Sequence, residues 1–180
     1  LRGIVVDNQS SPIPGARITV YMPAFSEEAT SVTAVSAADG RFALDGLSSG
    51  AALLTAEASG FVPHGQKLRL PRADDLILRL SSGGGTVLGH LYIRETGEAA
   101  AGARVTLSPT ADAWTPEGRL SAQTTSTDSL GEFRFDLLPA GEFRITARLG
   151  DLRLMPPASS KSHTIRLADR ETTTLPDLFL

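Results

Sequence analysis

The sequence repeats itself, and this repeat limits the possible folds more than any other feature. The stretch PGARITV at 14–20 returns as AGARVTL at 101–107. The stretch DGRFALDGLSSG at 39–50 returns as LGEFRFDLLPAG at 130–141, in the same order along the chain. Two similar segments predict two similar folding units rather than one large one. With 180 residues in all, each unit has the size of a small domain.

A run of serine and glycine separates the two copies. Residues 81–85 read Ser-Ser-Gly-Gly-Gly, a composition typical of a flexible linker. We therefore expect a first domain over residues 1–81, a linker over 82–85 and a second domain over 86–180.

Apolar and polar residues alternate with a period of two within each copy. Every second residue is apolar from Ala16 to Met22, and again from Phe143 to Leu149. This alternation predicts strands with one buried and one solvated face. The runs expected in the first copy are Arg2–Asp7, Ala16–Met22, Ser31–Ala37, Arg41–Leu44, Ala51–Ala58, Gln66–Leu70 and Leu76–Leu80. The second copy offers matching runs that end with Ser162–Leu167 and Thr172–Leu180.

Seven short strands in a copy of this size predict a two-sheet sandwich. The pair Asp39-Gly40, between two alternating runs, predicts a hairpin. At the turns, Gly40 and Gly131 are expected to adopt positive φ or to allow close approach of the backbone. No stretch shows a convincing helical stripe. The predicted fold class is all-β, with two tandem seven-stranded antiparallel sandwiches.

Two motifs place both copies near a known family. The first reads Gly-x-Val at 3–5, followed by Pro-x-x-Gly-Ala-x-Ile-x-Val at 12–20. The second reads Asp-x-x-Gly-x-Phe-x-Phe at 128–135, then Leu-x-x-Gly-x-Phe at 138–143. These motifs resemble the carboxypeptidase regulatory-like domain family, which implies a transthyretin-like (prealbumin-like) Greek-key sandwich for each copy. The first copy departs from the pattern, because Ala37 replaces the motif aspartate and Asp39 lies beside the glycine.

Composition excludes several kinds of chemistry. The absence of cysteine rules out disulfides, thiol catalysis and cysteine-ligated zinc. A net charge of −3 gives no basic excess for nucleic acid. No apolar run approaches the length of a membrane span, so we expect none in this segment.

The residues that could carry a reaction or a metal are not arranged for either. The histidines His64, His90 and His163 stand at no metal-ligand spacing. No Gly-x-Ser-x-Gly nucleophile motif is present. Asp39 and Asp128 lack the clustered oxygen ligands of a calcium loop and are expected to cap turns. We therefore predict that this segment is not an enzyme and has no catalytic, cofactor-binding or metal-binding residues and no cofactor.

Each copy has a long loop after its second strand, and each loop holds an aromatic residue. Phe25 lies in the loop Pro23–Thr30, and Trp114 lies in the loop Pro109–Leu120. Exposed aromatic rings at these positions would contact a sugar or a protein. In the alternative that we favour, each ring folds back to cover the open end of its own sandwich.

These observations predict a non-catalytic structural or interaction segment of a larger bacterial cell-envelope or secreted protein, acting as a spacer, in adhesion or in partner contact. Fifteen arginines against two lysines favour a GC-rich bacterial source. The alternative is an accessory carbohydrate- or peptide-binding module attached to an enzyme. The expected partner is a protein or a polysaccharide and not a nucleic acid. The family resemblance implies a periplasmic, cell-surface or extracellular location.

Overall fold

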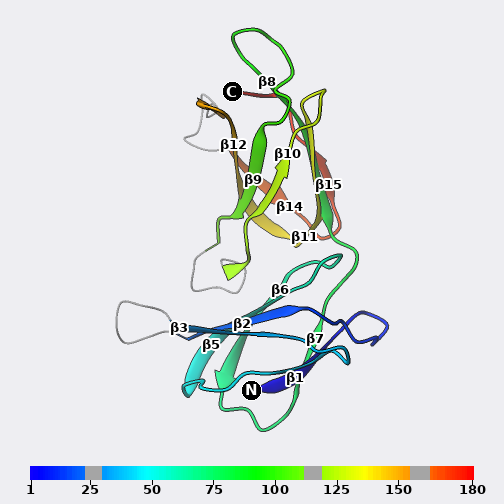
Figure 1. Cartoon of the computed structure of the whole chain (residues 1–180), viewed down its shortest axis with the longest axis vertical. Coiled ribbons are helices and arrows are strands. Elements are labelled where there is room, and N and C mark those ends of the chain that lie inside the picture. The colour runs from blue at the N-terminus through cyan, green and yellow to red at the C-terminus, as the bar shows by residue number, and fades with distance from the viewer. Residues whose placement is uncertain (23–29, 112–118, 155–162) are drawn as a thin grey trace. The chain divides into compact units, whose positions relative to one another are not determined.

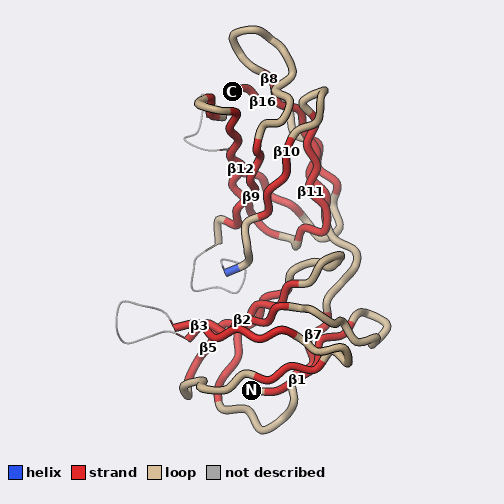
Figure 2. Tube along the Cα trace, in the orientation of Figure 1, coloured by secondary structure: helices blue, strands red, loops and turns tan. Residues whose placement is uncertain are grey.

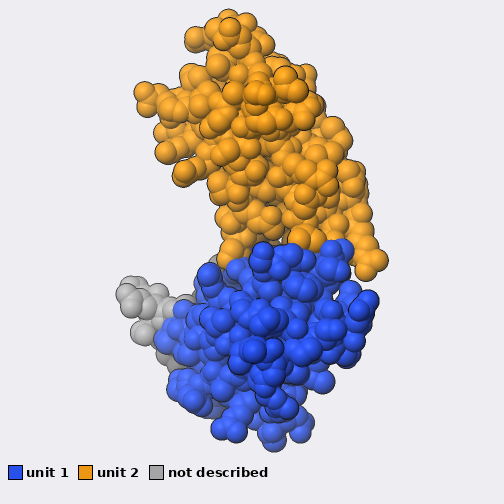
Figure 3. Space-filling model, turned by 45° about the vertical axis from the view of Figure 1, so that its right-hand side comes forward, with its two compact units in different colours: residues 1–83, 112–120 blue, residues 84–111, 121–180 orange. Residues whose placement is uncertain are grey.

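The computed structural model describes residues 1–22, 30–111, 119–154 and 163–180 (Figure 1). The chain divides into two compact units, which Figure 3 shows in different colours. Unit 1 comprises Leu1–Gly83 and Asp112–Leu120, and unit 2 comprises Gly84–Ala111 and Ser121–Leu180. Strands dominate both units (Figure 2), which confirms the all-β fold of two β-sandwiches.

Unit 1 packs a three-stranded sheet on a four-stranded one. Its strands are β1 (Arg2–Val6), β2 (Arg17–Met22), β3 (Thr30–Val35), β4 (Arg41–Ala43), β5 (Gly50–Glu57), β6 (His64–Leu70) and β7 (Leu76–Arg79). The sheet orders are β4-β1-β7 and β3-β2-β5-β6. All seven runs expected from the alternation of apolar residues form strands.

Unit 2 repeats this plan with two changes. Its strands are β8 (Gly85–Tyr92), β9 (Arg104–Pro109), β10 (Gln123–Ser126), β11 (Glu132–Leu138), β12 (Gly141–Leu149), β13 (Leu152–Arg153), β14 (His163–Leu167), β15 (Thr172–Thr174) and β16 (Leu178–Phe179). One sheet has the order β10-β9-β12-β13, with β14 also on β12, and the other has the order β11-β8-β15, with β16 also on β8. The short β13 is an addition. The expected last strand is divided into β15 and β16, with Pro176, which lacks a backbone N–H, between them.

Two expectations about strand pairing are wrong. Not every pair is antiparallel, because β7 runs parallel to β1, and β15 and β16 run parallel to β8. Asp39-Gly40 does form a tight turn, in which the Gly40 N–H donates to the Ala37 carbonyl at 2.9 Å. However, β3 and β4 on either side of the turn belong to different sheets. The turn therefore carries the chain across the sandwich instead of closing a hairpin.

Each unit has a hydrophobic core of its own. In unit 1 the alternating residues of β2 are buried as expected, with Ile18 and Val20 fully inaccessible. In unit 2 the alternating residues Phe143 and Ile145 of β12 are also buried, and they are 5% and 2% exposed. Burying a side chain of this size contributes about 1.5–3 kcal/mol to folding. The burial explains why the two copies conserve their alternation although their sequences differ.

A glycine faces a phenylalanine ring at the same place in both units. Gly3 of β1 pairs with Phe42 of β4, and Gly89 of β8 pairs with Phe133 of β11. A Cβ atom at Gly3 would lie 2.8 Å from the Phe42 ring, and one at Gly89 would lie 2.5 Å from the Phe133 ring. The glycines therefore leave the space that the rings fill in the two cores.

The turn glycines behave as predicted. Gly40 has φ 75° and Gly131 has φ 76°, a region that glycine enters with little strain. A Cβ atom at Gly40 would lie 2.5 Å from the Val5 carbonyl oxygen, and one at Gly131 would lie 2.4 Å from the Leu91 carbonyl oxygen. Both the backbone conformation and the close approach to the first strand of each unit therefore require glycine.

A buried hydroxyl group fastens the loop before the second strand in both units. Ser36 Oγ accepts from the Ala16 N–H at 2.8 Å and donates to the Ile13 carbonyl at 2.7 Å. Thr127 Oγ1 accepts from the Ala103 N–H at 2.8 Å and donates to the Ala100 carbonyl. Since Ser36 and Thr127 are buried, each 5% exposed, these bonds satisfy backbone groups in the interior.

Candidate binding surface

The outer face of β8 carries a group of ring side chains that contact one another. Strand β8 alternates between buried residues, such as Val87 and Leu91, and half-buried residues on the opposite face. The outward residues include His90 and Tyr92, so the period of two that builds the core also places these rings in a line.

Aromatic and cationic side chains continue this line beyond β8. The His90 and Tyr92 rings stack with centroids 6.3 Å apart and an interplanar angle of 11°. Tyr92 pairs with Phe179 of β16, and their ring centroids are 6.1 Å apart. The Arg94 guanidinium carbon lies 5.4 Å from the centroid of the Phe179 ring, within cation–π range. We call these four residues, His90, Tyr92, Arg94 and Phe179, the aromatic row.

Two hydrogen-bonded pairs that involve β11 border the aromatic row. Glu132 pairs with His90 in register, and its Oε1 lies 3.0 Å from His90 Nε2. Further along β11, Arg134 Nε donates to Asp136 Oδ2 at 2.6 Å, and Thr86 Oγ1 donates to Asp136 Oδ1 at 2.8 Å. The hydrogen bond from Arg134 is the main cause of the lowered pKa of Asp136, and the same bond raises the pKa of Arg134.

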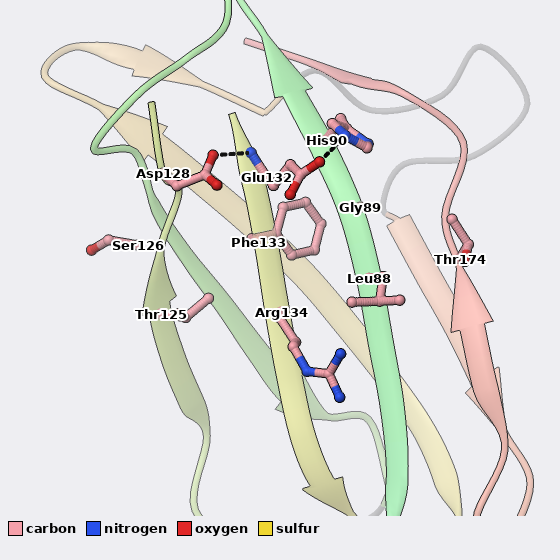
Figure 4. Close-up of a pocket in the computed structure, with 10 residues that line it drawn as sticks. All are labelled: Leu88, Gly89, His90, Thr125, Ser126, Asp128, Glu132, Phe133, Arg134 and Thr174. Carbon is pink, nitrogen blue, oxygen red and sulfur yellow. Dashed lines mark hydrogen bonds and ion pairs between the residues drawn. The ribbon is translucent and has the colours of Figure 1, made fainter. Parts of the chain in front are cut away.

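An open pocket of about 460 Å³ lies beside the His90–Glu132 pair (Figure 4). His90, Glu132 and Arg134 come from the β8–β11 sheet, while Thr125 and Ser126 come from β10 of the other sheet. Phe133 and Gly89 also line the pocket. The pocket thus offers hydroxyl, carboxylate, imidazole and guanidinium groups around an apolar centre, a combination that suits a polar ligand with one apolar face.

Asp128, which also lines this pocket, caps a turn. Its Oδ1 accepts from the Leu130 and Glu132 N–H groups, each at 2.9 Å. In unit 1, Asp39 Oδ1 accepts from the Arg41 N–H at 3.0 Å. Both aspartates therefore cap turns, as predicted. Among the residues that the structure describes, no three histidine or acidic side chains are grouped so that they could hold a metal ion.

The other residues singled out from the sequence are not brought together at this surface. His64 lies in β6 of unit 1 and His163 lies in β14 of unit 2, in the sheet opposite that of His90. Phe25 and Trp114 lie outside the described residues. Both alternatives for these rings, folding back over the sandwich and contact with a partner, therefore stay predictions.

The aromatic row was missed in the sequence, although a signal for it was present. Because Gly3 and Gly89 hold the same place opposite a phenylalanine, His90 of unit 2 corresponds to Ile4 of unit 1. The outer face of unit 1 is aliphatic there, with Ile4 beside Ile77, which is 58% exposed. His90 in unit 2 thus stands where unit 1 has the aliphatic Ile4. This difference between the copies was the signal that unit 2 has a polar, ring-bearing surface at this place.

Comparison with known proteins gives a family match for the first unit. Residues 1–81 match the carboxypeptidase regulatory-like domain model. The matched stretch covers all seven strands of unit 1. The second unit repeats the strand plan of the regulatory-like domain but lies outside the matched stretch. A search of curated protein sequences found no match.

Several solved structures have a similar arrangement of strands. The minor pilin GBS52 from Streptococcus agalactiae is 12% identical with a TM-score of 0.47, over 99% of this chain and 95% of the pilin. A streptococcal ancillary pilin is 13% identical with a TM-score of 0.41, and this chain spans 61% of its length. The shaft pilin SpaA from Lactobacillus rhamnosus GG is 12% identical with a TM-score of 0.38, over 99% of this chain and 96% of that one.

No helix in the described ranges is both long and apolar enough to cross a bilayer.

Proposed function

We propose that this chain is a non-catalytic structural and interaction segment of a larger bacterial cell-envelope or secreted protein. Its two units, the second also of the regulatory-like type, serve as spacer, adhesion or partner-contact modules outside the cytoplasm. One observation carries this proposal. The buried polar residues at matching places of the two copies hold the fold, as the bonds of Ser36 and Thr127 to backbone groups illustrate.

The His90–Glu132 pair is the polar pair that comes nearest to a general acid–base arrangement. It lies on an exposed sheet face, where the side chains of His90 and Glu132 are 38% and 53% exposed. A nucleophile held against an imidazole is the usual third component of such a site. The ring neighbour that the structure gives to His90 is Tyr92, at stacking distance. This environment fits a surface contact better than a reaction centre.

The location and the lack of catalysis are tested together. The parent protein, carrying an epitope tag, is expected in the envelope fraction or the medium of its bacterium. The purified 180-residue chain is expected to turn over no ester, peptide or glycoside substrate. A cytoplasmic location would contradict the first part of the proposal. Turnover that is lost in both His90→Ala and Glu132→Ala would contradict the second.

The second candidate function is that of an accessory module that binds carbohydrate or peptide, and the aromatic row favours it. Tyr92 and Phe179 offer ring faces, while Arg94, His90 and Glu132 offer hydrogen-bonding groups beside them. Rings flanked by polar groups are typical of surfaces where a few residues supply most of the binding energy.

The second candidate is tested by titrating the chain with neutral oligosaccharides, acidic oligosaccharides and short peptides. Binding is expected to weaken at least tenfold, about 1.4 kcal/mol, in Tyr92→Ala and Phe179→Ala. The matched controls are Ile4→Ala and Ile77→Ala, which change the corresponding face of unit 1 and should leave binding unchanged. Equal losses in both sets of variants would exclude the aromatic row as the binding surface.

A further inference from the structure

Strand β3 is a sheet edge that lacks the usual protection against pairing. It ends the sheet β3-β2-β5-β6, and no other described strand pairs with its free side. Its six residues, TSVTAV, contain no charge and no proline, and the surrounding sequence stays uncharged from 29 to 38. Edge strands of soluble proteins are normally blunted by charges, prolines, bulges or very short length.

The other described edge strands of the molecule do have such protection. Charged residues stand in β4, β6, β7, β11, β13 and β14, for example Arg41 in β4 and Arg79 in β7. The uncharged edges β10, β15 and β16 have only four, three and two residues. Among these edges, β3 is thus the one that is both long and neutral.

The hydrogen-bond register of β3 shows which of its backbone groups face outward. The Ser36 N–H donates to the Ala16 carbonyl of the neighbouring chain segment, and the register from Arg17↔Val35 to Met22↔Thr30 is regular. In an antiparallel ladder, successive residues direct their N–H and C=O groups alternately to one side and the other. Ser31, Thr33 and Val35 therefore direct theirs to the free edge.

We propose that two copies of this chain associate by antiparallel pairing of β3 with β3, which joins their four-stranded sheets into one. The pairing is centred on a two-fold axis at Thr33. In this register Thr33 faces its own copy and Ser31 faces Val35, so all six outward backbone groups of each strand are bonded. Val32 then faces Ala34, which keeps the residues that pack against the core of unit 1 on the core side of the joined sheet.

A second copy is the partner that the charge pattern favours. In a two-fold interface each residue meets the same surface patch on the other copy, so a charged edge would bring like charges together near the axis. Strand β3 has no charge to repel its own copy. A Thr–Thr pair at the axis is also a favourable cross-strand pair in antiparallel sheets.

The test is sedimentation equilibrium of the 180-residue chain from about 1 μM to about 1 mM, the range in which weak association is measured. A reversible monomer–dimer equilibrium is expected. Thr33→Lys and Thr33→Glu, each alone, should raise the dimer dissociation constant at least about tenfold, because like charges would meet at the axis. An equimolar mixture of the two variants should restore the dimer, since Lys then faces Glu.

Thr124→Lys is the matched control. Thr33 Oγ1 lies 3.1 Å from Thr19 Oγ1, and Thr124 Oγ1 lies 3.1 Å from Thr106 Oγ1 at the corresponding place of unit 2. Both lysine variants lose the same contact, but only Thr33→Lys charges the proposed axis, so Thr124→Lys should dimerise normally. A chain that stays monomeric throughout the concentration range would overturn the proposal. So would a failure of the mixed variants to associate, or equal weakening by Thr124→Lys.

Discussion

The two units form the same turn before their fourth strand, but different side chains stabilise it. In unit 2, Asp128 accepts from two backbone N–H groups of that turn. In unit 1 the corresponding residue is Ala37, and Asp39 supplies one bond to the Arg41 N–H. The backbone bonds of the two turns are otherwise alike, since Ala37 and Asp128 each receive the N–H of the turn glycine. The two turns therefore share their glycine and their backbone bonds, while the carboxylate bonds that strengthen them differ.

The largest effect is expected at the turn glycines. Gly40→Ala and Gly131→Ala should each cost at least about 3 kcal/mol of unfolding free energy, because positive φ strain adds to a clash with a backbone oxygen. Gly15→Ala and Gly102→Ala are matched controls with φ 72° and no atom within 4 Å of the added Cβ, and they should cost about 1 kcal/mol. Urea unfolding followed by circular dichroism measures the difference. If the four alanine variants lost equal amounts of unfolding free energy, the close approach of Gly40 and Gly131 to a carbonyl oxygen would be contradicted.

The buried hydroxyls come next. Ser36→Ala and Thr127→Val should each destabilise their unit by about 1–3 kcal/mol, because a buried N–H group and a buried carbonyl lose their partner. The same unfolding measurement applies, with the exposed Thr124→Val as a control expected to change the free energy by less than about 0.5 kcal/mol. If Ser36→Ala were neutral while Thr127→Val were costly, the two loops would not be equivalent.

The carboxylate caps should have a smaller effect on the free energy of unfolding. The cap can be removed from unit 2 at Asp128 and introduced into unit 1 at Ala37. Asp128→Ala should cost about 1 kcal/mol. Ala37→Asp should stabilise unit 1 by less than about 1 kcal/mol, since an aspartate there would gain the Asp39 N–H while Asp39 already accepts from the Arg41 N–H. Thermal melts of the two variants, alone and combined, would show opposite shifts. A destabilising Ala37→Asp would mean that the turns differ in more than this residue.

The exposed Arg134–Asp136 ion pair of unit 2 should contribute least to the free energy of unfolding. Because the pKa of Asp136 is lowered in the folded chain, its contribution is present above the unfolded pKa of about 3.9 and is lost as the pH falls through the lower folded pKa. Asp136→Asn should therefore cost less than about 0.5 kcal/mol at pH 7, and this cost should shrink as the pH falls through the lowered pKa of Asp136. Asp45→Asn is the control in unit 1, where Ala43 stands at the place of Arg134. A cost that grows toward acid pH would have the wrong sign.

Strand positions, core residues and turn glycines could be predicted from the sequence because local residue patterns determine them. The alternation in Ala16–Met22 and the pair Asp39-Gly40 show burial and chain reversal within a few residues. The parallel pairing of β1 with β7 could not be read in this way, because the direction of pairing depends on how distant strands meet. For the same reason Asp39-Gly40 predicted a hairpin, although its strands join different sheets.

The candidate binding surface depends even more on distant contacts. Tyr92 and Phe179 lie far apart in the sequence and become neighbours only because β16 pairs in parallel with β8. The Arg94–Phe179 contact follows from the same pairing. What the sequence did contain was a difference between the copies, since His90 stands where Ile4 stands in unit 1.

Each copy of the repeat should be a complete folding unit. Cutting the chain between the copies tests this most directly. Residues 1–83, the main part of unit 1, and residues 84–180, which also carry 112–120, are expressed separately. Each should give a β-sheet circular dichroism spectrum and a single cooperative melt. The reason is that each contains its own core, turn glycine and buried hydroxyl. If both fragments proved unfolded, the two units would be parts of one domain, and the account would be wrong.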